Sequence, residues 1–387
     1  MDKLIRITTV PISLLILLKS QLKFMSNHYE VIAVSSGGEM LDQVRDQAGV
    51  KTVPVEMTRK ITPLKDIIAL WNLYKLIKRE RPKFVHTHTP KAGLLGMIAA
   101  SMAGVPVRLH TVAGMPLLES TGLKRKVLDV VEKITYGFAT KVYPNSNQMK
   151  KIILENNYCK SSKLHVIGNG SSNGIDTTYF SPYLFVEKEE TLLEAKLRLR
   201  KKYDVPPTAL VYSFIGRMVN DKGLKELIGA FVEINKTRPD TLLILVGPFE
   251  NDLDPLDNYT EDQVKNHPAI NWFGFQKDVR PYLFISDIFV FPSYREGFPN
   301  VVMQSGAMGL PSIVSNINGC NEIIVDYENG IIVPPKNMEK LKTAMAELYD
   351  DVQLRAKFAK NSRAMILSRF DQNYLWGELL REYRTLN

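Results

Sequence analysis

Short apolar runs alternate with stretches of helical periodicity through the first half of the chain. The runs are rich in β-branched residues and cover Ile5–Val10, Tyr29–Ser35, Phe84–Thr87, Val107–Thr111, Lys141–Pro144 and Leu164–Ile167. Runs of this kind predict buried strands. Between them, helices are predicted over Leu14–Met25, Gly38–Asp46, Pro63–Arg79, Ala92–Met102, Lys124–Phe138 and Ser146–Asn156. Strand followed by helix, repeated in this way, predicts a parallel sheet with both faces covered.

The same alternation starts again near residue 208. Strands are predicted over Leu210–Ile215, Leu242–Val246, Ile270–Phe273, Ile288–Phe291, Ser312–Ser315 and Ile331–Val333, and helices over Leu224–Ile234, Val301–Met308 and Met338 to the end, with a break near Arg369–Asp371. Between the halves, the charged stretch Glu187–Lys202 ends at two prolines, which is typical of a connecting helix and hinge. We therefore predict two α/β domains, 1–185 and 208–368, a linker at 186–207 and a C-terminal helix at 369–387.

Composition narrows the class of protein. Hydrophobic residues make up 45% and charged residues 24% of the chain, which is typical of a folded globular protein. The apolar run Pro11–Phe24 is interrupted by Lys19 and Lys23 and is too short to span a bilayer. The two cysteines, Cys159 and Cys320, form no metal-binding or disulfide pattern, so a reducing cytoplasm fits best. The formal charge of +9 favours anionic partners, but no RNP-like or zinc-finger pattern indicates nucleic acid.

The turn Gly216-Arg217-Met218-Val219-Asn220-Asp221-Lys222-Gly223 follows a predicted strand and opens a helix. Glycines let the backbone approach a ligand, and a helix start presents amide groups and a positive dipole to an anion. Arg217 and Lys222 add two full charges, which together suit a diphosphate. A plain surface turn with two solvated cations is the alternative interpretation.

A second helix start lies at Ser293-Tyr294-Arg295-Glu296-Gly297-Phe298-Pro299-Asn300, after the strand Ile288–Phe291. Pro299 suits the first turn of the helix and Gly309 suits its end. Glu296 would lie where a ligand approaches, and a sugar hydroxyl is a natural donor to its carboxylate. Alternatively, Glu296 only caps the helix.

These two motifs, in the second of two Rossmann-like domains, resemble the retaining glycosyltransferases of family-4 type with the GT-B fold. The resemblance extends to Asn173-Gly174-Ile175-Asp176 and Asn321-Glu322, and is strongest to bacterial enzymes that build capsular, exopolysaccharide or O-antigen units on a lipid diphosphate. It implies two parallel sheets facing across a cleft, with the C-terminal helix returning to the first domain. It also implies a nucleotide diphosphate sugar as donor, with UDP the expected nucleotide, and a polyprenyl-diphosphate-linked glycan as acceptor, with no metal or other cofactor.

The resemblance assigns roles in the second domain. Arg217 and Lys222 would bind the donor diphosphate and act catalytically with Glu296, which contacts the donor sugar. The adjoining backbone would hold sugar and phosphate, at Gly216, Gly297, Phe298, Pro299 and Asn300. Gln304 stands where the family has a second glutamate, so one acceptor oxygen replaces two toward the ribose. Glu250 either positions the nucleoside or is a loop carboxylate in water.

In the first domain, His110 ends a predicted strand and resembles the family histidine that reaches the donor sugar. A histidine that only stabilises the end of the strand is the alternative. His86, His88 and Lys91 follow another strand and are candidates for acceptor contacts, with Lys91 near the lipid diphosphate. No carboxylate or thiol cluster completes a metal site with the two histidines. Asp252-Leu253-Asp254 matches the Asp-x-Asp of metal-dependent transferases, but the fold does not need it.

Residues Met115-Pro116-Leu117-Leu118 through Lys124-Arg125-Lys126 combine apolar side chains with cations. Such a segment either docks on the inner face of the cell membrane or forms an ordinary helix packed on the sheet. The expected location is therefore the cytoplasm, with peripheral membrane contact as one option. Rival functions are a GT-B epimerase or phosphorylase, and a sugar-nucleotide binding protein without catalytic activity.

Overall fold

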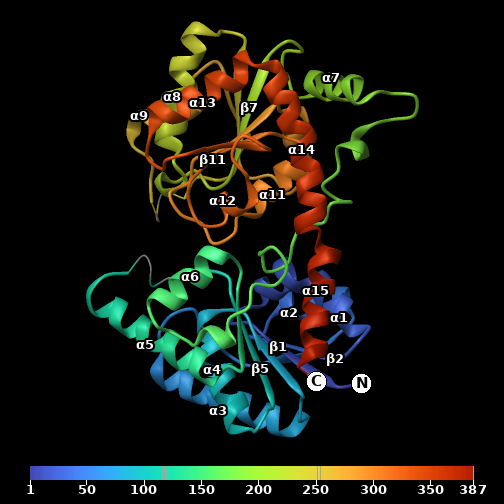
Figure 1. The fold of residues 1–387 in the computed structure, drawn as a ribbon, viewed down its shortest axis with the longest axis vertical. Coiled ribbons are helices and arrows are strands. Elements are labelled where there is room, and N and C mark those ends of the chain that lie inside the picture. Colours follow the sequence, from blue (N-terminus) through green and yellow to red (C-terminus); the bar gives the residue numbers. More distant parts are fainter. Residues whose placement is uncertain (116, 118–119, 251, 253, 387) are drawn as a thin grey trace. The chain divides into compact units, whose positions relative to one another are not determined.

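The first sheet contains six parallel strands in the order β3-β2-β1-β4-β5-β6, as the computed structural model in Figure 1 shows. Their bounds are β1 Lys3–Ile7, β2 Glu30–Ser35, β3 Lys51–Pro54, β4 Phe84–Thr87, β5 Val107–Val112 and β6 Lys141–Pro144. The structure describes all residues except 116, 118–119, 251, 253 and 387. The sequence did not indicate the short edge strand β3. The strand expected at Leu164–Ile167 is wrong, because in that segment only Leu164 makes a bridge, to Val142.

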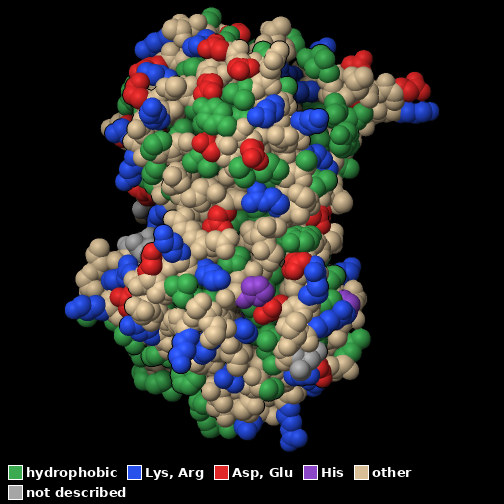
Figure 2. Space-filling model, in the orientation of Figure 1, with side chains coloured by type: hydrophobic (Ala, Val, Ile, Leu, Met, Phe, Trp, Pro, Cys, Tyr) green, Lys and Arg blue, Asp and Glu red, His purple; other side chains and the backbone are tan. Residues whose placement is uncertain are grey.

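Helices cover both faces of this sheet, since alternate strand residues enter two separate cores. Leu4 packs with α1, α2 and α15, whereas Ile5 and Ile7 pack on the face that carries α3 and α4. The helical segments are η1 Ser13–Leu18, α1 Lys19–Ser26, α2 Glu39–Ala48, α3 Pro63–Glu80, α4 Pro90–Met102, α5 Gly122–Phe138, α6 Asn147–Glu155, the 3-10 turn η3 Ser161–Lys163 and α15 Gln372–Thr385. Hydrophobic side chains gather at the surface over α3 and α5, along the lower left margin of Figure 2.

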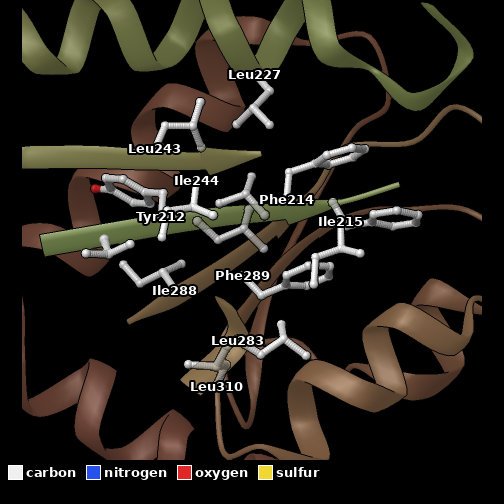
Figure 3. Packing of buried hydrophobic residues seen from close by; sticks show 14 of the residues in the cluster. Tyr212, Phe214, Ile215, Leu227, Leu243, Ile244, Leu283, Ile288, Phe289 and Leu310 are labelled. Carbon is white, nitrogen blue, oxygen red and sulfur yellow. The ribbon is translucent and has the colours of Figure 1, made fainter. Parts of the chain in front are cut away.

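The second sheet repeats the architecture, with the order β12-β11-β10-β7-β8-β9 and parallel pairing throughout. Its strands are β7 Leu210–Ile215, β8 Thr241–Val246, β9 Ile270–Trp272, β10 Ile288–Phe291, β11 Ser312–Ser315 and β12 Gly330–Val333. Its helices are α7 Leu192–Lys202, α8 Leu224–Thr237, α9 Asn258–Asn266, α10 Arg280–Ile285, α11 Asn300–Ala307, α12 Cys320–Ile323, α13 Met338–Asp350 and α14 Val352–Phe370. Figure 3 shows the apolar core around β7, where Tyr212 and Phe214 are fully buried. Both sheets are thus Rossmann-like, as predicted.

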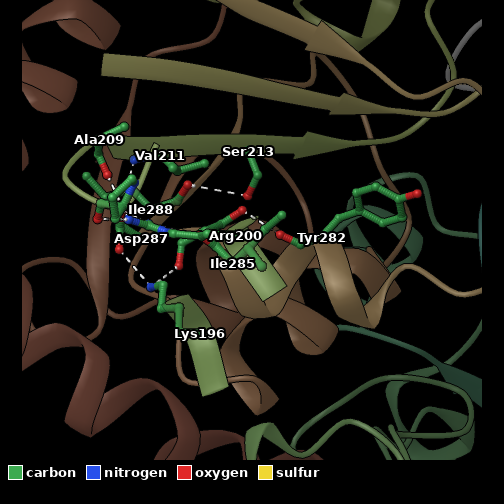
Figure 4. A network of polar contacts seen from close by, with 11 residues as sticks. Lys196, Arg200, Ala209, Val211, Ser213, Tyr282, Ile285, Asp287 and Ile288 are labelled. Atoms are coloured by element: carbon green, nitrogen blue, oxygen red, sulfur yellow. Dashed lines mark hydrogen bonds and ion pairs between the residues drawn. The ribbon is translucent and has the colours of Figure 1, made fainter. Parts of the chain in front are cut away.

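The segment expected to be a linker is a packed part of the second unit. Helix α7 is fixed by Asp287, whose carboxylate receives Lys196 Nζ at 2.7 Å and Arg200 Nη2 at 2.6 Å (Figure 4). Arg200 also donates to the backbone oxygens of Ile285 and Ala209, so its guanidinium is fully engaged although it is buried. A carboxylate shared by the buried Arg200 and the partly exposed Lys196 holds α7 against the sheet.

The chain divides into two units at different residues from those expected. One unit comprises Met1–Asn173 and Asn373–Asn387, and the other comprises Gly174–Gln372. The boundary falls before Ile175 because this residue pairs with the end of α14: its amide donates to Phe370 O, and Gln372 N donates to its own carbonyl, both at 2.9 Å. The C-terminal helix α15 belongs to the first unit, which confirms its predicted return.

Candidate functional site

The turn after β7 is packed tightly against two neighbouring turns. A side chain at Gly223, where φ is +71°, would meet Pro292 O at 2.1 Å, and one at Gly247 would meet Gly216 O at 1.8 Å. Only glycine allows these approaches. The 3-10 turn η5 (Asn220–Lys222) and the start of α8 are thereby held at the carboxyl ends of β7, β8 and β10, where open α/β sheets bind ligands.

Asp221 joins the loop after β7 to the loop after β10. Its backbone oxygen accepts from Tyr294 N at 2.9 Å and lies 3.3 Å from Ser293 Oγ. Its carboxylate receives the Arg295 guanidinium at 2.8 Å. From the other side, Asp254 accepts the Asp221 amide at 2.7 Å. The two motifs that were singled out in the sequence are therefore one connected structure.

Lys222 and Glu296 meet at the centre of this structure. Lys222 Nζ lies 2.5 Å from Glu296 Oε1, and the two side chains are only 13% and 16% exposed. Ser293 Oγ donates to the same carboxylate oxygen at 3.1 Å. A largely buried cation and a carboxylate in contact can together receive an anion and a hydroxyl donor on adjacent atoms of one ligand.

Arg217 lies in the turn directly after β7, at the same edge of the sheet, and is more exposed than Lys222. Its Nη1 donates to Glu250 Oε2 at 2.7 Å, with side chains 42% and 33% exposed. The pKa of Arg217 is raised, first by this hydrogen bond, with smaller contributions from the charges of Asp221 and Glu296. Arg217 is therefore a permanent cation within electrostatic range of Glu296. The structure brings Arg217, Lys222, Glu250 and Glu296 together in one unit.

Asn318 and Gly319 support the Glu296 loop from behind, and the sequence analysis missed them. Asn318 Nδ2 donates to Glu296 O at 3.2 Å and also to Gly297 O. At Gly319, with φ +76°, a side chain would meet Gly297 O at 2.7 Å. The Asn-Gly pair is a turn signal that could have marked this position.

The remaining donor candidates lie on the helix that this loop opens. Pro299 is the N-cap of α11, Asn300 is its first residue, and Phe298 packs on the core. Gln304 is partly exposed one turn further along, and its side-chain amide makes no hydrogen bond within the described part of the chain. Its contact with a ribose stays a prediction.

His86 and His88 belong to a buried polar cluster that centres on Arg6, a residue without a role in the sequence analysis. Arg6 is fully buried on β1, and its Nε donates to His88 Nε2 at 2.9 Å. His86, which is 1% exposed, contacts the Tyr383 hydroxyl and Thr111 Oγ1. Burial and neighbouring positive charges hold the pKa of both histidines well below the usual range. His88 remains partly exposed just beyond β4.

His110 and Lys91 are both engaged within the first unit. His110 is 3% exposed and packs over Gly93, with Nδ1 2.7 Å from Thr87 Oγ1, and burial lowers its pKa to about 4. Lys91 forms an ion pair with Asp66 at 2.7 Å. A lipid diphosphate would have to compete with this carboxylate for Lys91. The roles assigned to both residues stay predictions.

Three further candidates from the sequence were a metal site, the Asp-x-Asp segment and a membrane segment. Within the described residues, no group of three or more His, Cys, Asp or Glu side chains could hold a metal ion. Leu253 of the Asp-x-Asp segment lies outside the described residues, as do Pro116 and Leu118 of the proposed membrane segment. The helices that the structure describes include none with the length and apolar character needed to cross a bilayer.

Each half of the chain matches a known glycosyltransferase family model. Residues 195–365 match the family model described as "Glycosyl transferases group 1". Residues 25–170 match the "Glycosyl transferase 4-like domain". The two matches correspond to the two Rossmann-like units.

Individual relatives match over almost the full length. The capsular polysaccharide biosynthesis glycosyltransferase CapM of Staphylococcus aureus is 32% identical, over 95% of this chain and 93% of that protein. The UDP-Gal:alpha-D-GlcNAc-diphosphoundecaprenol alpha-1,3-galactosyltransferase of Escherichia coli is 32% identical, over 86% and 83%.

Solved structures share the fold at lower identity. A Rickettsia africae glycosyltransferase superimposes with a TM-score of 0.81 at 22% identity, covering 100% of this chain and 98% of the other. Anabaena Alr3699/HepE, crystallised with UDP and glucose, has a TM-score of 0.81 at 16% identity, with 100% of both chains covered. These likenesses support the GT-B fold.

Proposed function

Since the chain belongs to the glycosyl transferases group 1 family, we propose that this glycosyltransferase uses a UDP-linked hexose or N-acetylhexosamine as donor. The acceptor we propose is a saccharide on a polyprenyl diphosphate, and the product a unit of a surface polysaccharide. The names of the two relatives supply this support, one a capsule enzyme and the other a transferase to a diphosphoundecaprenol-linked sugar. The complex of HepE with UDP and glucose supports UDP as the nucleotide of the proposed donor.

The contact between Lys222 and Glu296 is the observation that carries the proposal. Donor binding would redirect the Lys222 ammonium to the diphosphate and the Glu296 carboxylate to hydroxyls of the sugar. Arg217, exposed at the same edge, would add a planar fork to the diphosphate. Negative charge grows on the leaving diphosphate during transfer, so both cations accelerate the reaction if they bind that charge more strongly in the transition state.

We propose that transfer retains the anomeric configuration by attack from the face that the diphosphate leaves. A leaving diphosphate oxygen would accept the proton of the acceptor hydroxyl as the new glycosidic bond forms. This route requires no enzyme nucleophile. Glu296, paired with Lys222, would orient the sugar rather than attack it.

A transfer assay with purified protein tests the proposal. UDP-galactose, UDP-glucose and their N-acetyl forms would be combined with a short-chain prenyl diphosphate that carries one sugar, and the anomeric configuration of the product read by NMR. Lys222→Ala and Arg217→Ala should each lower turnover by roughly 100-fold or more, as loss of a preorganised charge does. Lys225→Ala removes an exposed cation from the first turn of α8, three residues further along, and should leave turnover unchanged. Equal activity of Lys222→Ala and Lys225→Ala would refute the assignment.

We also propose that the first unit docks on an anionic membrane. Large apolar side chains are exposed along the outer faces of α3 and α5: Leu64, Ile67, Ile68 and Trp71, and Leu123, Val127, Val130 and Ile134. Lys65, Lys75, Lys124, Lys126 and Lys133 lie among them in the sequence. An apolar helix face interleaved with cations suits the boundary of an anionic bilayer.

Flotation with phosphatidylglycerol vesicles tests the docking surface. The protein should float at low salt, and the pair Leu64→Ser and Ile68→Ser should lose most of the bound fraction. Val352→Ser, an equally exposed apolar position on α14, is the matched control. If the unaltered protein stays unbound, or if sedimentation shows that these residues close a dimer, the membrane proposal is wrong.

A further inference from the structure

Arg6 is a buried cation whose side-chain partners are all formally neutral. Nε donates to His88 Nε2 at 2.9 Å and Nη1 donates to the Tyr383 hydroxyl at 3.3 Å, while Nη2 donates to Gln21 Oε1. Within the described residues, no carboxylate forms an ion pair with this guanidinium. Arginine keeps its protons even when buried, so these nitrogens can only donate. Every partner of Arg6 is therefore forced to accept.

That requirement fixes the tautomer of His88. A neutral imidazole has one N–H and one lone pair, and the hydrogen bond at one nitrogen decides where the proton lies. Because His88 Nε2 accepts from Arg6, the proton of His88 must be on Nδ1. No described residue accepts a hydrogen bond from His88 Nδ1.

The neighbouring histidine is fixed in the opposite sense. Tyr383 Oη accepts from Arg6, so its own proton is available to His86 Nδ1. His86 then carries its proton on Nε2, which lies 2.7 Å from Thr111 Oγ1. The two rings stack at a centroid distance of 4.3 Å, an arrangement that disfavours charge on both.

We propose that Arg6 is a positioning residue that makes His88 a hydrogen-bond donor, through Nδ1–H, to an oxygen of the acceptor substrate. His88 then serves to bind a hydroxyl or diphosphate oxygen and not to remove a proton. This role rests on the proposed function for the identity of the ligand, whereas the two tautomers rest on the geometry alone. Both histidines are also poor metal ligands in this arrangement, because His88 Nε2 and His86 Nδ1 already accept hydrogen bonds.

The low basicity of His88 agrees with this role. Desolvation, followed by the charge of Arg6, lowers its pKa well below the usual range for histidine. Protonation at Nε2 would require the hydrogen bond from Arg6 to break. A general base would need the opposite, a lone pair directed at the substrate and a pKa near the working pH.

Side-chain NMR tests the tautomers directly. With histidine labelled by ¹⁵N, long-range ¹H–¹⁵N spectra of the full chain at pH 7 should show His88 protonated on Nδ1 and His86 on Nε2, assigned with His88→Asn and His86→Asn. Tyr383→Phe removes the donor to His86 and should disturb only the His86 pattern. A His88 signal with the proton on Nε2, or a mixture of tautomers, would overturn the inference.

A ligand titration and two matched variants test the role. Addition of a short-chain prenyl diphosphate sugar should move the His88 Nδ1–H resonance; binding that leaves it unmoved contradicts the role. His88→Asn keeps an amide donor near the Nδ1 position, and His88→Gln keeps one near Nε2. We expect the acceptor KM to rise less than threefold in the first and about tenfold in the second, with donor KM unchanged. The reverse order would overturn the role. Absence of transfer by the unaltered protein, with the resonance still shifted by the ligand, would refute the proposed function alone.

Discussion

Gln304 is the residue whose chemistry departs most clearly from the pattern that the family resemblance implies. Its amide offers one acceptor oxygen where a glutamate would offer two. If it binds the ribose, Gln304→Ala should raise the donor KM about fivefold, the equivalent of one hydrogen bond of ~1 kcal/mol. Gln304→Glu should lower the donor KM. Donor titrations at saturating acceptor measure both, and an unchanged KM for Gln304→Ala would remove this residue from the site.

Glu80 gives the first unit a pH dependence. Its carboxylate, 7% exposed, receives Lys51 at 2.9 Å and Lys3 at 3.0 Å, and these hydrogen bonds lower its pKa from 4.5 to about 2. A carboxyl group whose pKa is lower in the folded than in the unfolded protein stabilises the fold at any pH above its unfolded pKa. This stabilisation is lost as the pH falls from about 4.5 toward 2.

Glu80→Gln should therefore lower the unfolding free energy at pH 7 by about 1 kcal/mol, a modest value because both lysines are partly exposed. The difference from the unaltered protein should shrink at pH 3. Urea unfolding at the two pH values measures this, with the exposed Glu155→Gln as control. A difference that is equal at both pH values would contradict the electrostatic explanation.

At the scale of elements, the start of α8 depends on the space that Gly223 leaves. Gly223→Ala would place a methyl group 2.1 Å from Pro292 O and impose a left-handed conformation on alanine. We expect η5 to shift away from β10, with a loss of at least 1 kcal/mol in stability and a turnover reduced along with it. Gly377→Ala in α15 has no atom within 4 Å of the new group and should be neutral or slightly stabilising. Thermal unfolding of both variants provides the comparison.

The elements themselves were largely predictable because buried parallel strands read as continuous apolar runs. Phe84–Thr87 and Leu210–Ile215 begin and end where the sequence analysis placed them. Strand β3 escaped prediction because Lys51–Pro54 is a short, half-exposed edge strand that ends in proline. Helix α7 was predicted as a helix, but its attachment to the second unit depends on Asp287, which lies far along the chain.

The candidate site was predictable only to the level of loops. Glycines and charges after two predicted strands marked the candidate turns, and the structure places both turns at the carboxyl ends of the neighbouring strands β7 and β10. The contact of Lys222 with Glu296, and that of Lys91 with Asp66, are side-chain pairings between distant segments that periodicity does not encode. The role of Arg6 could not be predicted for the same reason, since a single cation within an apolar strand forms no recognisable sequence motif.

At the scale of the whole molecule, the two units differ in how the chain builds them. The second unit is one continuous segment, 174–372, closed where Ile175 pairs with the end of α14. The first unit combines residues 1–173 with residues 373–387. Helix α15 contributes buried side chains to the core over α1 and α2, namely Leu375, Leu379, Leu380 and Tyr383.

We expect the four buried side chains of α15 to determine whether residues 1–173 can fold without residues 373–387. Burying each contributes roughly 1.5 to 3 kcal/mol, so their sum is on the order of the 5 to 15 kcal/mol that stabilises a typical domain. We expect fragment 174–372 to unfold cooperatively in urea, and fragment 1–173 to lack a cooperative transition. Joining 373–387 to fragment 1–173 through a flexible linker should restore the transition. The same fusion with Leu375→Asp and Leu379→Asp should not show a cooperative transition. This variant keeps the linker and the helical segment but loses the apolar contact with the core. A cooperative transition in fragment 1–173 alone would show that α15 only covers a core that is already complete.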